Sequence, residues 1–462
     1  MVAFTKLPPE LILEIAKCVE PPHLASFYGI NQNVYLQTKQ HRDKYQYLKR
    51  KFAQPLSTNH PGSTAQLLKS IILEPEAALY VQEWRLDDYR FEWGPRAPHE
   101  PVHVEYSEAD MMIFESAIRE VHNDDNDTVL QAMRDGDEEP LIYITLTKLP
   151  NLTSVILQNL NGEERLPSND QLYFSINEMV SNSLSLGGVS QSQSVTALMP
   201  SLNQVWVEPG FNPDHPTAFI DAGAIEAFAA LPSVREINGH RIGGYRYDAF
   251  LAYPVETSYA TVLKLSMCDI SAERMFLFLE GFTHLQEFTY WPAARAESSQ
   301  PYEPLFIVRA LMFAAKDTLR RLTLRSASTW TSYMGSLRRF NALEYLETDL
   351  TSLIVDFRRD MTLDLALPPT LQQIKLFDRS NNRATVDYFL TEVVDNETLL
   401  PCLDQLSFVL QSGAMGDTEM EDWKYEYQEA GISLEFENYD QVPLPLFAKS
   451  HAIFPYYMEE RP

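Results

Sequence analysis

The clearest pattern in the chain is a short phrase of apolar residues that recurs over most of its length. In each copy, apolar side chains stand at a first position and again three and five residues later. Full copies occupy residues 152–157, 202–207, 285–290, 319–324, 371–376 and 403–408, and weaker copies stand at Val234 with Ile237, Leu263 with Leu265, and Leu343 with Leu346. Because residues two apart lie on the same face of a strand, each phrase predicts a short strand with one buried face.

Segments with helical spacing of apolar residues separate these strands. They cover residues 224–231, 272–282 and 305–315, and a related unit begins earlier with a helix over 67–72 and a strand over 81–86. The later copies follow one another at roughly 24 to 34 residues, which fits or slightly exceeds the leucine-rich repeat range. One strand and one returning helix per unit predict an α/β fold, a curved leucine-rich-repeat-like solenoid with a parallel sheet, because stacked units share a core that one unit cannot form.

The N-terminal segment shows a different pattern, which predicts helices. Pro8 and Pro9 favour a helix start, since their missing N–H groups would be unpaired in the first turn, and Glu10 complements the positive end of the helix. An apolar stripe follows at spacings of three and four, formed by Leu11, Ile12, Ile15, Ala16 and Val19. Pro21 and Pro22 end this helix, and a second helix is predicted over 23–36, with the stripe Leu24, Phe27, Ile30, Val34 and Tyr35.

This segment, beginning Leu7-Pro8-Pro9-Glu10-Leu11, resembles the F-box, a helical motif of ubiquitin ligase substrate receptors. The resemblance implies docking on a Skp-type adaptor, which links the F-box protein to cullin and RING subunits. The residues that match the motif, and are expected to contact the adaptor, are Leu7, Pro8, Pro9, Leu11, Ile12, Ile15, Leu24, Phe27, Ile30 and Val34. An ordinary N-terminal helical hairpin packed on the rest of the chain is the alternative.

The order of the two patterns, F-box first and irregular repeats after, is similar to that of many F-box proteins of filamentous fungi. It implies the substrate-recognition subunit of an SCF-type ubiquitin ligase, whose repeats bind an unknown target protein. Aromatic residues on or just after predicted strands are candidates for contact with that target: Trp206, Tyr290, Trp291, Trp330 and Tyr333. A non-degradative F-box scaffold and an unrelated hydrolase are the alternatives.

Turn-forming residues suggest the domain boundaries. Residues 54–63 are rich in Pro, Ser, Gly and Asn, which favour turns. We therefore expect an F-box module over 1–53, a linker over 54–66, the repeats over 67–440 and a C-terminal tail over 441–462. An acidic stretch over 120–139 and a Ser-rich stretch over 181–194 are expected to be loops that interrupt the array.

The net charge of −27 argues against nucleic acid and anionic membranes as partners, because both are held mainly by Lys and Arg. The charge is uneven: residues 1–60 carry eight Lys or Arg against four Asp or Glu, which leaves −31 for the remainder. A basic module agrees with docking on an acidic Skp-type adaptor.

Candidate chemistry is scarce. The three cysteines, Cys18, Cys268 and Cys402, lie far apart and lack metal-ligand spacing, and Cys18 is expected to be a small buried apolar residue. Motifs for zinc hydrolysis, serine hydrolysis and phosphate binding are absent from the sequence. We therefore expect no catalytic residues, no metal and no cofactor, and a place in the cytoplasm or nucleus because no signal peptide or membrane span is evident.

Overall fold

The structure is a computed structural model of the whole chain. It describes residues 7–58, 62–86, 105–121, 130–131, 133–134, 139–159, 199–209, 219–222, 225, 228–243, 258–293, 302–326, 332–354, 366–379, 383–395 and 397–438. The predicted tail over 441–462, the Ser-rich stretch over 181–194 and most of the acidic stretch over 120–139 lie outside the described residues.

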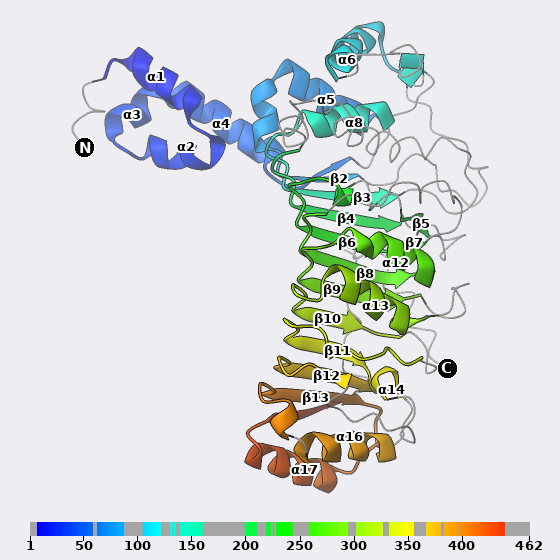
Figure 1. Cartoon of the computed structure of the whole chain (residues 1–462). Coiled ribbons are helices and arrows are strands. Elements are labelled where there is room, and N and C mark those ends of the chain that lie inside the picture. The colour runs from blue at the N-terminus through cyan, green and yellow to red at the C-terminus, as the bar shows by residue number, and fades with distance from the viewer. Residues whose placement is uncertain are drawn as a thin grey trace. The chain divides into compact units, whose positions relative to one another are not determined.

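The fold is mixed helix and sheet, with one twelve-stranded parallel sheet (Figure 1). The order of its strands in space follows their order in the chain, β1-β2-β3-β4-β6-β8-β9-β10-β11-β12-β13-β14. Two short strands, β5 (Ile220–Asp221) and β7 (Ile242–Gly243), form a separate parallel pair. The predicted α/β class and parallel sheet are therefore confirmed.

The described elements divide into two compact units. The first unit begins with four helices, α1 (Pro9–Cys18), α2 (Pro21–Tyr28), α3 (Gln32–Gln37) and α4 (Lys39–Phe52). It continues with β1 (Leu56–Thr58), α5 (Ser63–Leu73), the 3-10 helix η2 (Pro75–Tyr80), β2 (Glu83–Leu86), α6 (Glu108–Val121), α8 (Glu139–Thr147) and β3 (Ser154–Asn159). The predicted helix before Pro75 and the strand after it are confirmed as α5 and β2.

Prolines and one asparagine set the boundaries of the first three helices. Helix α1 begins at Pro9, as predicted, and α2 begins at Pro21, where a proline suits the first turn. The single helix predicted over 23–36 is wrong, because it is broken into α2 and α3. Asn31 has extended backbone angles, and its side chain accepts a hydrogen bond from the Val34 N–H at 2.9 Å, which starts a new helix there.

The second unit consists mainly of strands that pair in sequence. Its strands in the large sheet are β4 (Gln204–Pro209), β6 (Glu236–His240), β8 (Val262–Cys268), β9 (Glu287–Pro292), β10 (Arg321–Leu324), β11 (Tyr345–Asp349), β12 (Gln373–Asp378), β13 (Gln405–Leu410) and β14 (Ser433–Asn438). Its helices are α12 (Ala272–Glu280), α13 (Pro304–Ala314), α14 (Leu350–Leu353), α16 (Arg383–Asp395), the 3-10 helix η5 (Glu397–Leu399) and α17 (Asp417–Glu429). In Figure 1, α12 and α13 lie side by side next to the strands.

A ladder of apolar residues runs through this unit and forms its core. Each strand contributes the residue three places into the recurring phrase, and the paired residues are Val205, Ile237, Leu263, Phe288, Leu322, Leu346, Ile374, Leu406 and Leu434. All nine are buried. Apart from β14, which ends the sheet, each of these strands has a neighbour on both sides, so the apolar residues of adjacent strands cover one another.

Every phrase found in the sequence is a strand in the structure, and the predicted helices over 272–282 and 305–315 are α12 and α13. Strand β14 was not predicted. Its phrase has Gly431, with a positive φ of 79°, at the first position instead of a large apolar residue. Strand β1 was also not predicted. It lies inside the segment 54–66, which was expected to be a linker, and it pairs with β2.

Among the described residues, no helix combines the length and the apolar character needed to cross a bilayer.

Candidate protein-binding surfaces

The N-terminal helical module, which we define as helices α1 to α4, exposes aliphatic side chains to solvent. Leu11 on α1 is 50% exposed, Ile30 between α2 and α3 is 43% exposed, and Leu36 on α3 is 62% exposed. Single exposed apolar residues are ordinary, but several on one small module are a feature of surfaces that another protein covers.

Helix α1 has an inner and an outer apolar face. Ile12 and Ala16, four residues apart, are fully buried, whereas Leu11 and Ile15 occupy the neighbouring positions and are half-exposed and half-buried. Leu7, just before the helix, is also half-buried. The inner face is enough to hold α1 on the module, so the outer face is available for a partner.

An arginine on α4 holds the aromatic ring of α3 in place. The guanidinium of Arg42 lies 3.6 Å from the ring centroid of Tyr35 and donates a hydrogen bond to the Tyr35 carbonyl oxygen at 2.9 Å. Tyr35 itself is 48% exposed and adjoins Leu36 in the chain. This stacking fixes an exposed aromatic side chain before any partner arrives.

The interior of the module is aromatic and uncharged. The Tyr28 hydroxyl lies 2.8 Å from Nδ1 of His41, and the Tyr28 ring packs edge-on against Tyr45. Burial lowers the pKa of His41, so its imidazole stays neutral at neutral pH. The module therefore has a core of its own in addition to its exposed surface.

The ten residues predicted to contact the adaptor divide into two sets in the structure. Pro8, Pro9, Leu11 and Ile30 are exposed, and Leu7 and Ile15 are half-buried. Ile12, Leu24, Phe27 and Val34 are buried inside the module, where a partner would not reach them. Sequence periodicity marks both sets alike, because it records apolar positions and not which face they cover.

Helix α4 carries most of the basic side chains of the module. Lys44 pairs with Glu74 at 3.2 Å and with Glu76 at 2.8 Å, and a hydrogen bond to Glu76 is the main cause of the raised pKa of Lys44. Lys49, Arg50 and Lys51 in its last turn are exposed and complement the negative end of the helix.

Cys18 is exposed, which corrects the expectation that it is a buried apolar residue.

The second unit offers a polar sheet face, opposite the apolar ladder. Alternate residues of each strand lie on this face, and its middle row runs Asn238, Lys264, Thr289, Thr323, Glu347, Lys375, Ser407 and Glu435. Ion pairs join different strands there: Lys264 Nζ lies 3.1 Å from Glu287 on the adjacent strand, and Lys375 Nζ lies 2.7 Å from Glu437, two strands away.

A buried arginine ties four strands together on the same face. Arg325, at the end of β10, is 3% exposed. Its guanidinium carbon lies 3.7 Å from the ring centroid of Phe377 and 4.8 Å from that of Trp291, and its Nη1 lies 3.6 Å from Glu347. These contacts fix the shape of the face between β9 and β12.

An aspartate at the end of β11 lies in the same region. Burial raises the pKa of Asp349 to about 6, although the Arg379 charge and a hydrogen bond from the Ser326 N–H, at 2.5 Å, act in the opposite direction. The energetic cost of burying this carboxylate makes the site sensitive to pH.

The aromatic residues predicted to contact a target do not form one surface. Tyr290 and Trp291 are 3% and 7% exposed, which corrects the expectation that they are surface residues. Trp206 and Tyr333 are half-buried, and Trp330 lies outside the described residues. In a strand flanked by others, a large ring is buried by its neighbours, so the sequence position alone did not indicate exposure.

A serine–histidine pair on this face is unsuited to nucleophilic catalysis. His240 Nδ1 lies 2.8 Å from Ser266 Oγ, but Ser266 is 2% exposed. Burial, and then the Arg241 charge, lower the pKa of His240 to about 3, so its imidazole is too weak a base to activate a hydroxyl. In the part of the chain that the structure describes, no three His, Cys, Asp or Glu side chains gather as metal ligands.

A comparison with protein-family models finds none that matches the chain, and a comparison with curated proteins finds no match either.

Proposed function

We propose that the chain is the substrate-recognition subunit of an SCF-type cullin–RING ubiquitin ligase. In this proposal the N-terminal helical module is an F-box that docks on a Skp-type adaptor, and the adaptor connects it to cullin and RING subunits. The remaining strands and helices form a leucine-rich-repeat-like solenoid that binds a target protein. The chain positions the target, and other subunits supply the chemistry in the cytoplasm or nucleus.

The observation that carries the adaptor part of the proposal is the two-faced helix α1. Its inner residues Ile12 and Ala16 complete the core of the module, while Leu11 is 50% exposed directly after the Leu-Pro-Pro-Glu segment that resembles the F-box start. Ile30 between α2 and α3, and Tyr35 and Leu36 on α3, are further large apolar or aromatic residues that this small module exposes. Several such residues on one module, more than Leu11 alone, favour a surface that another protein covers.

Charge supports the same partner. Residues 1–60 are basic, whereas the rest of the chain is strongly acidic. An acidic adaptor would be attracted to the module and repelled by the remainder, which orients the encounter.

The regular pairing of β4 to β14 supports the solenoid part. Each of these strands pairs in parallel with the next strand of the large sheet, and the same phrase position falls on the ladder every time. Such repetition gives a broad polar sheet face, which suits recognition of a protein surface.

The proposal is tested by purifying the full chain together with a Skp-type adaptor, a cullin and its RING subunit. Removing the module by truncation is unsuitable, because Tyr45 of α4 packs against Tyr80 of η2, with ring centroids 5.9 Å apart, and truncation would uncover it. Co-purification of all four proteins supports the proposal, and ubiquitin transfer to a bound protein separates a ligase receptor from a non-degradative scaffold. A full-length chain that leaves the adaptor unbound contradicts it.

A further inference from the structure

Basic side chains from two neighbouring repeats meet at the edge of the sheet where the strands begin. Two arginine doublets, Arg320–Arg321 and Arg338–Arg339, lie just before or at the start of β10 and β11. Backbone hydrogen bonds join their loops: the Tyr345 N–H donates to the Arg320 carbonyl oxygen and the Asn341 N–H to the Lys316 carbonyl oxygen, both at 2.9 Å.

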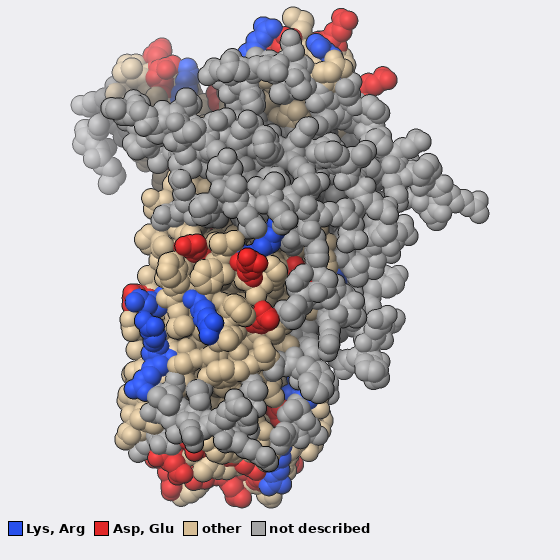
Figure 2. Space-filling view, turned by 45° about the vertical axis from the view of Figure 1, so that its right-hand side comes forward, with Lys and Arg blue, Asp and Glu red and all other residues tan. Residues whose placement is uncertain are grey.

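This edge is basic although the chain as a whole is acidic. Residues 316–321 and 338–345 hold five basic residues, Lys316, Arg320, Arg321, Arg338 and Arg339, and two acidic ones, Asp317 and Glu344. Glu287, the register partner of Arg321 in β9, pairs with Lys264. Glu344 pairs with Arg320 at 3.4 Å, and Asp317 accepts a hydrogen bond from the Asn341 side chain at 2.5 Å. The four arginines are exposed. Figure 2 shows Lys and Arg side chains gathered along the left edge of the molecule, at the height of β9–β12 in Figure 1.

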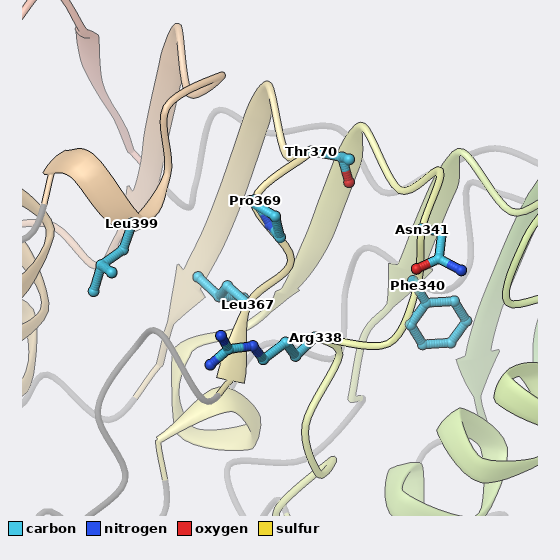
Figure 3. A pocket seen from close by; sticks show the side chains of 7 residues that line it. All are labelled: Arg338, Phe340, Asn341, Leu367, Pro369, Thr370 and Leu399. Carbon is cyan, nitrogen blue, oxygen red and sulfur yellow. The ribbon is translucent and has the colours of Figure 1, made fainter.

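A pocket of about 280 Å³ has Arg338, the first residue of the second doublet, in its lining. It is lined by Arg338, Phe340, Asn341, Leu367, Pro369, Thr370 and Leu399. Figure 3 shows Leu399 at the left, Phe340 and Asn341 at the right, and Leu367 and the Arg338 side chain between them. Phe340 and Leu367 are almost fully buried, so they form a fixed apolar floor beside a cationic rim.

We propose that this pocket and the arginine doublets bind an acidic peptide segment of the target protein, with one apolar side chain of the peptide in the pocket and its carboxylates on the arginines. The inference rests on the proposed function in that the peptide belongs to the target. Arginine binds a carboxylate with two parallel N–H donors. Salt and water screen this interaction less when an apolar contact beside it excludes solvent.

Size and charge favour this ligand over others. The pocket, at about 280 Å³, is at the lower end of the roughly 300–1,000 Å³ usual for drug-sized ligands, and it has room for one apolar side chain. A nucleic acid would have to approach a chain of net charge −27 through a few arginines, whereas a short acidic peptide meets only the basic edge. The net negative charge of the chain would repel an acidic peptide from other parts of the second unit, which adds specificity for the basic edge.

The test is fluorescence anisotropy with the full chain and labelled peptides that carry a central Phe flanked by Glu on both sides. Companion peptides replace the Glu residues by Gln, or the Phe by Ser. The variant is Arg338→Glu with Arg339→Glu. Its matched control, Arg119→Glu with Arg309→Glu, makes the same charge change at exposed arginines on α6 and α13. Circular dichroism checks that both variants are folded.

We expect the Glu–Phe peptide to bind, and the Arg338/Arg339 variant to weaken it about tenfold or more while the control variant does not. Both companion peptides should bind more weakly than the parent, and added salt should weaken the parent. Equal binding of the Gln peptide, equal loss in both variants, or no binding of the parent overturns the inference. Binding of the Skp-type adaptor is measured on the same preparations. If the adaptor binds but the peptide result is negative, only the peptide inference fails; if the adaptor does not bind, the proposed function fails.

Discussion

The guanidinium of Arg325 lies 3.7 Å from the ring centroid of Phe377, although strand β11 separates their two strands in the sheet. A side chain that reaches over a neighbouring strand in this way connects two strands that are not paired with each other. Glu347, on the strand between them, pairs with the same guanidinium. The polar face of the second unit is therefore held by side chains as well as by the backbone ladder.

Arg325→Ala should destabilise the protein by about 3 kcal/mol, because it removes the stacking and leaves Glu347 without its cation in a largely buried place. Urea unfolding followed by circular dichroism measures the change. Arg339→Ala is the control and should alter the free energy of unfolding by less than about 0.5 kcal/mol, since this side chain is exposed. A similar small loss at both positions would show that the stacked arrangement contributes no stability.

Gly239→Ala should be strongly destabilising for a steric reason. A Cβ at this position in β6 would lie 2.7 Å from Ile225 Cδ1, 2.8 Å from Ile242 Cγ1 and 2.9 Å from Leu265 Cδ2. Overpacking of this kind costs about 1–3 kcal/mol. Gly416→Ala is the control without a steric clash, because a Cβ there meets nothing within 4 Å. Since Gly416 is the N-cap of α17, where Ala is less favourable than Gly, it should cost no more than about 1 kcal/mol in the same unfolding experiment.

Asp349 should make the stability of the second unit depend on pH. Its raised pKa, about 6, means that the folded state binds a proton more tightly than the unfolded state does. The contribution of this carboxyl therefore favours folding below its ordinary pKa of 3.8 and is lost as the pH rises through about 6.

The measurement is the free energy of unfolding of the wild type minus that of Asp349→Asn, between about pH 4 and pH 7. This difference should fall by roughly 2–3 kcal/mol over that range. The variant keeps an oxygen that can accept the Ser326 hydrogen bond. Asp404→Asn measures the general effect of removing one exposed carboxyl, and an Asp349 difference that is independent of pH would contradict the assignment.

The two faces of α1 should respond differently to truncation. Ile12→Ala removes a fully buried side chain and should lower the free energy of unfolding of the module by about 2–4 kcal/mol. Leu11→Ala, at a half-exposed position on the same helix, should cost less than about 1 kcal/mol. Native-state hydrogen exchange of the α1 backbone amides gives both free energies of unfolding. Equal losses in the two variants would mean that Leu11 belongs to the core.

Much of the strand pattern could be predicted from the sequence, because the signal is local. Leu285, Phe288 and Tyr290 stand at the first, fourth and sixth positions of one phrase, and all three are buried as the alternation requires. Strand β14 escaped prediction because Gly431 replaces the first apolar residue of its phrase. The break between α2 and α3 escaped because a cap at Asn31 outweighed a continuous apolar stripe.

The surfaces were harder to predict, because they depend on residues distant in the chain. Leu11 and Ile12 are adjacent and similar in type, yet one is half-exposed and the other fully buried. The doublets Arg320–Arg321 and Arg338–Arg339 look unremarkable in an acidic sequence, and only the folded chain joins their loops, through the hydrogen bond from the Asn341 N–H to the Lys316 carbonyl oxygen.

The most direct test of the account is a calorimetric titration of a Skp-type adaptor into the full-length chain, into Leu11→Asp and into Leu73→Asp. Leu73 is the matched control, because it is 65% exposed on α5, outside the module. We predict that the wild type and Leu73→Asp bind alike, whereas Leu11→Asp, which brings an unpaired charge into the interface, loses several kcal/mol of binding free energy and shows no measurable heat. Leu11→Asp binding as tightly as the wild type, while folded, would contradict the docking of this module on the adaptor.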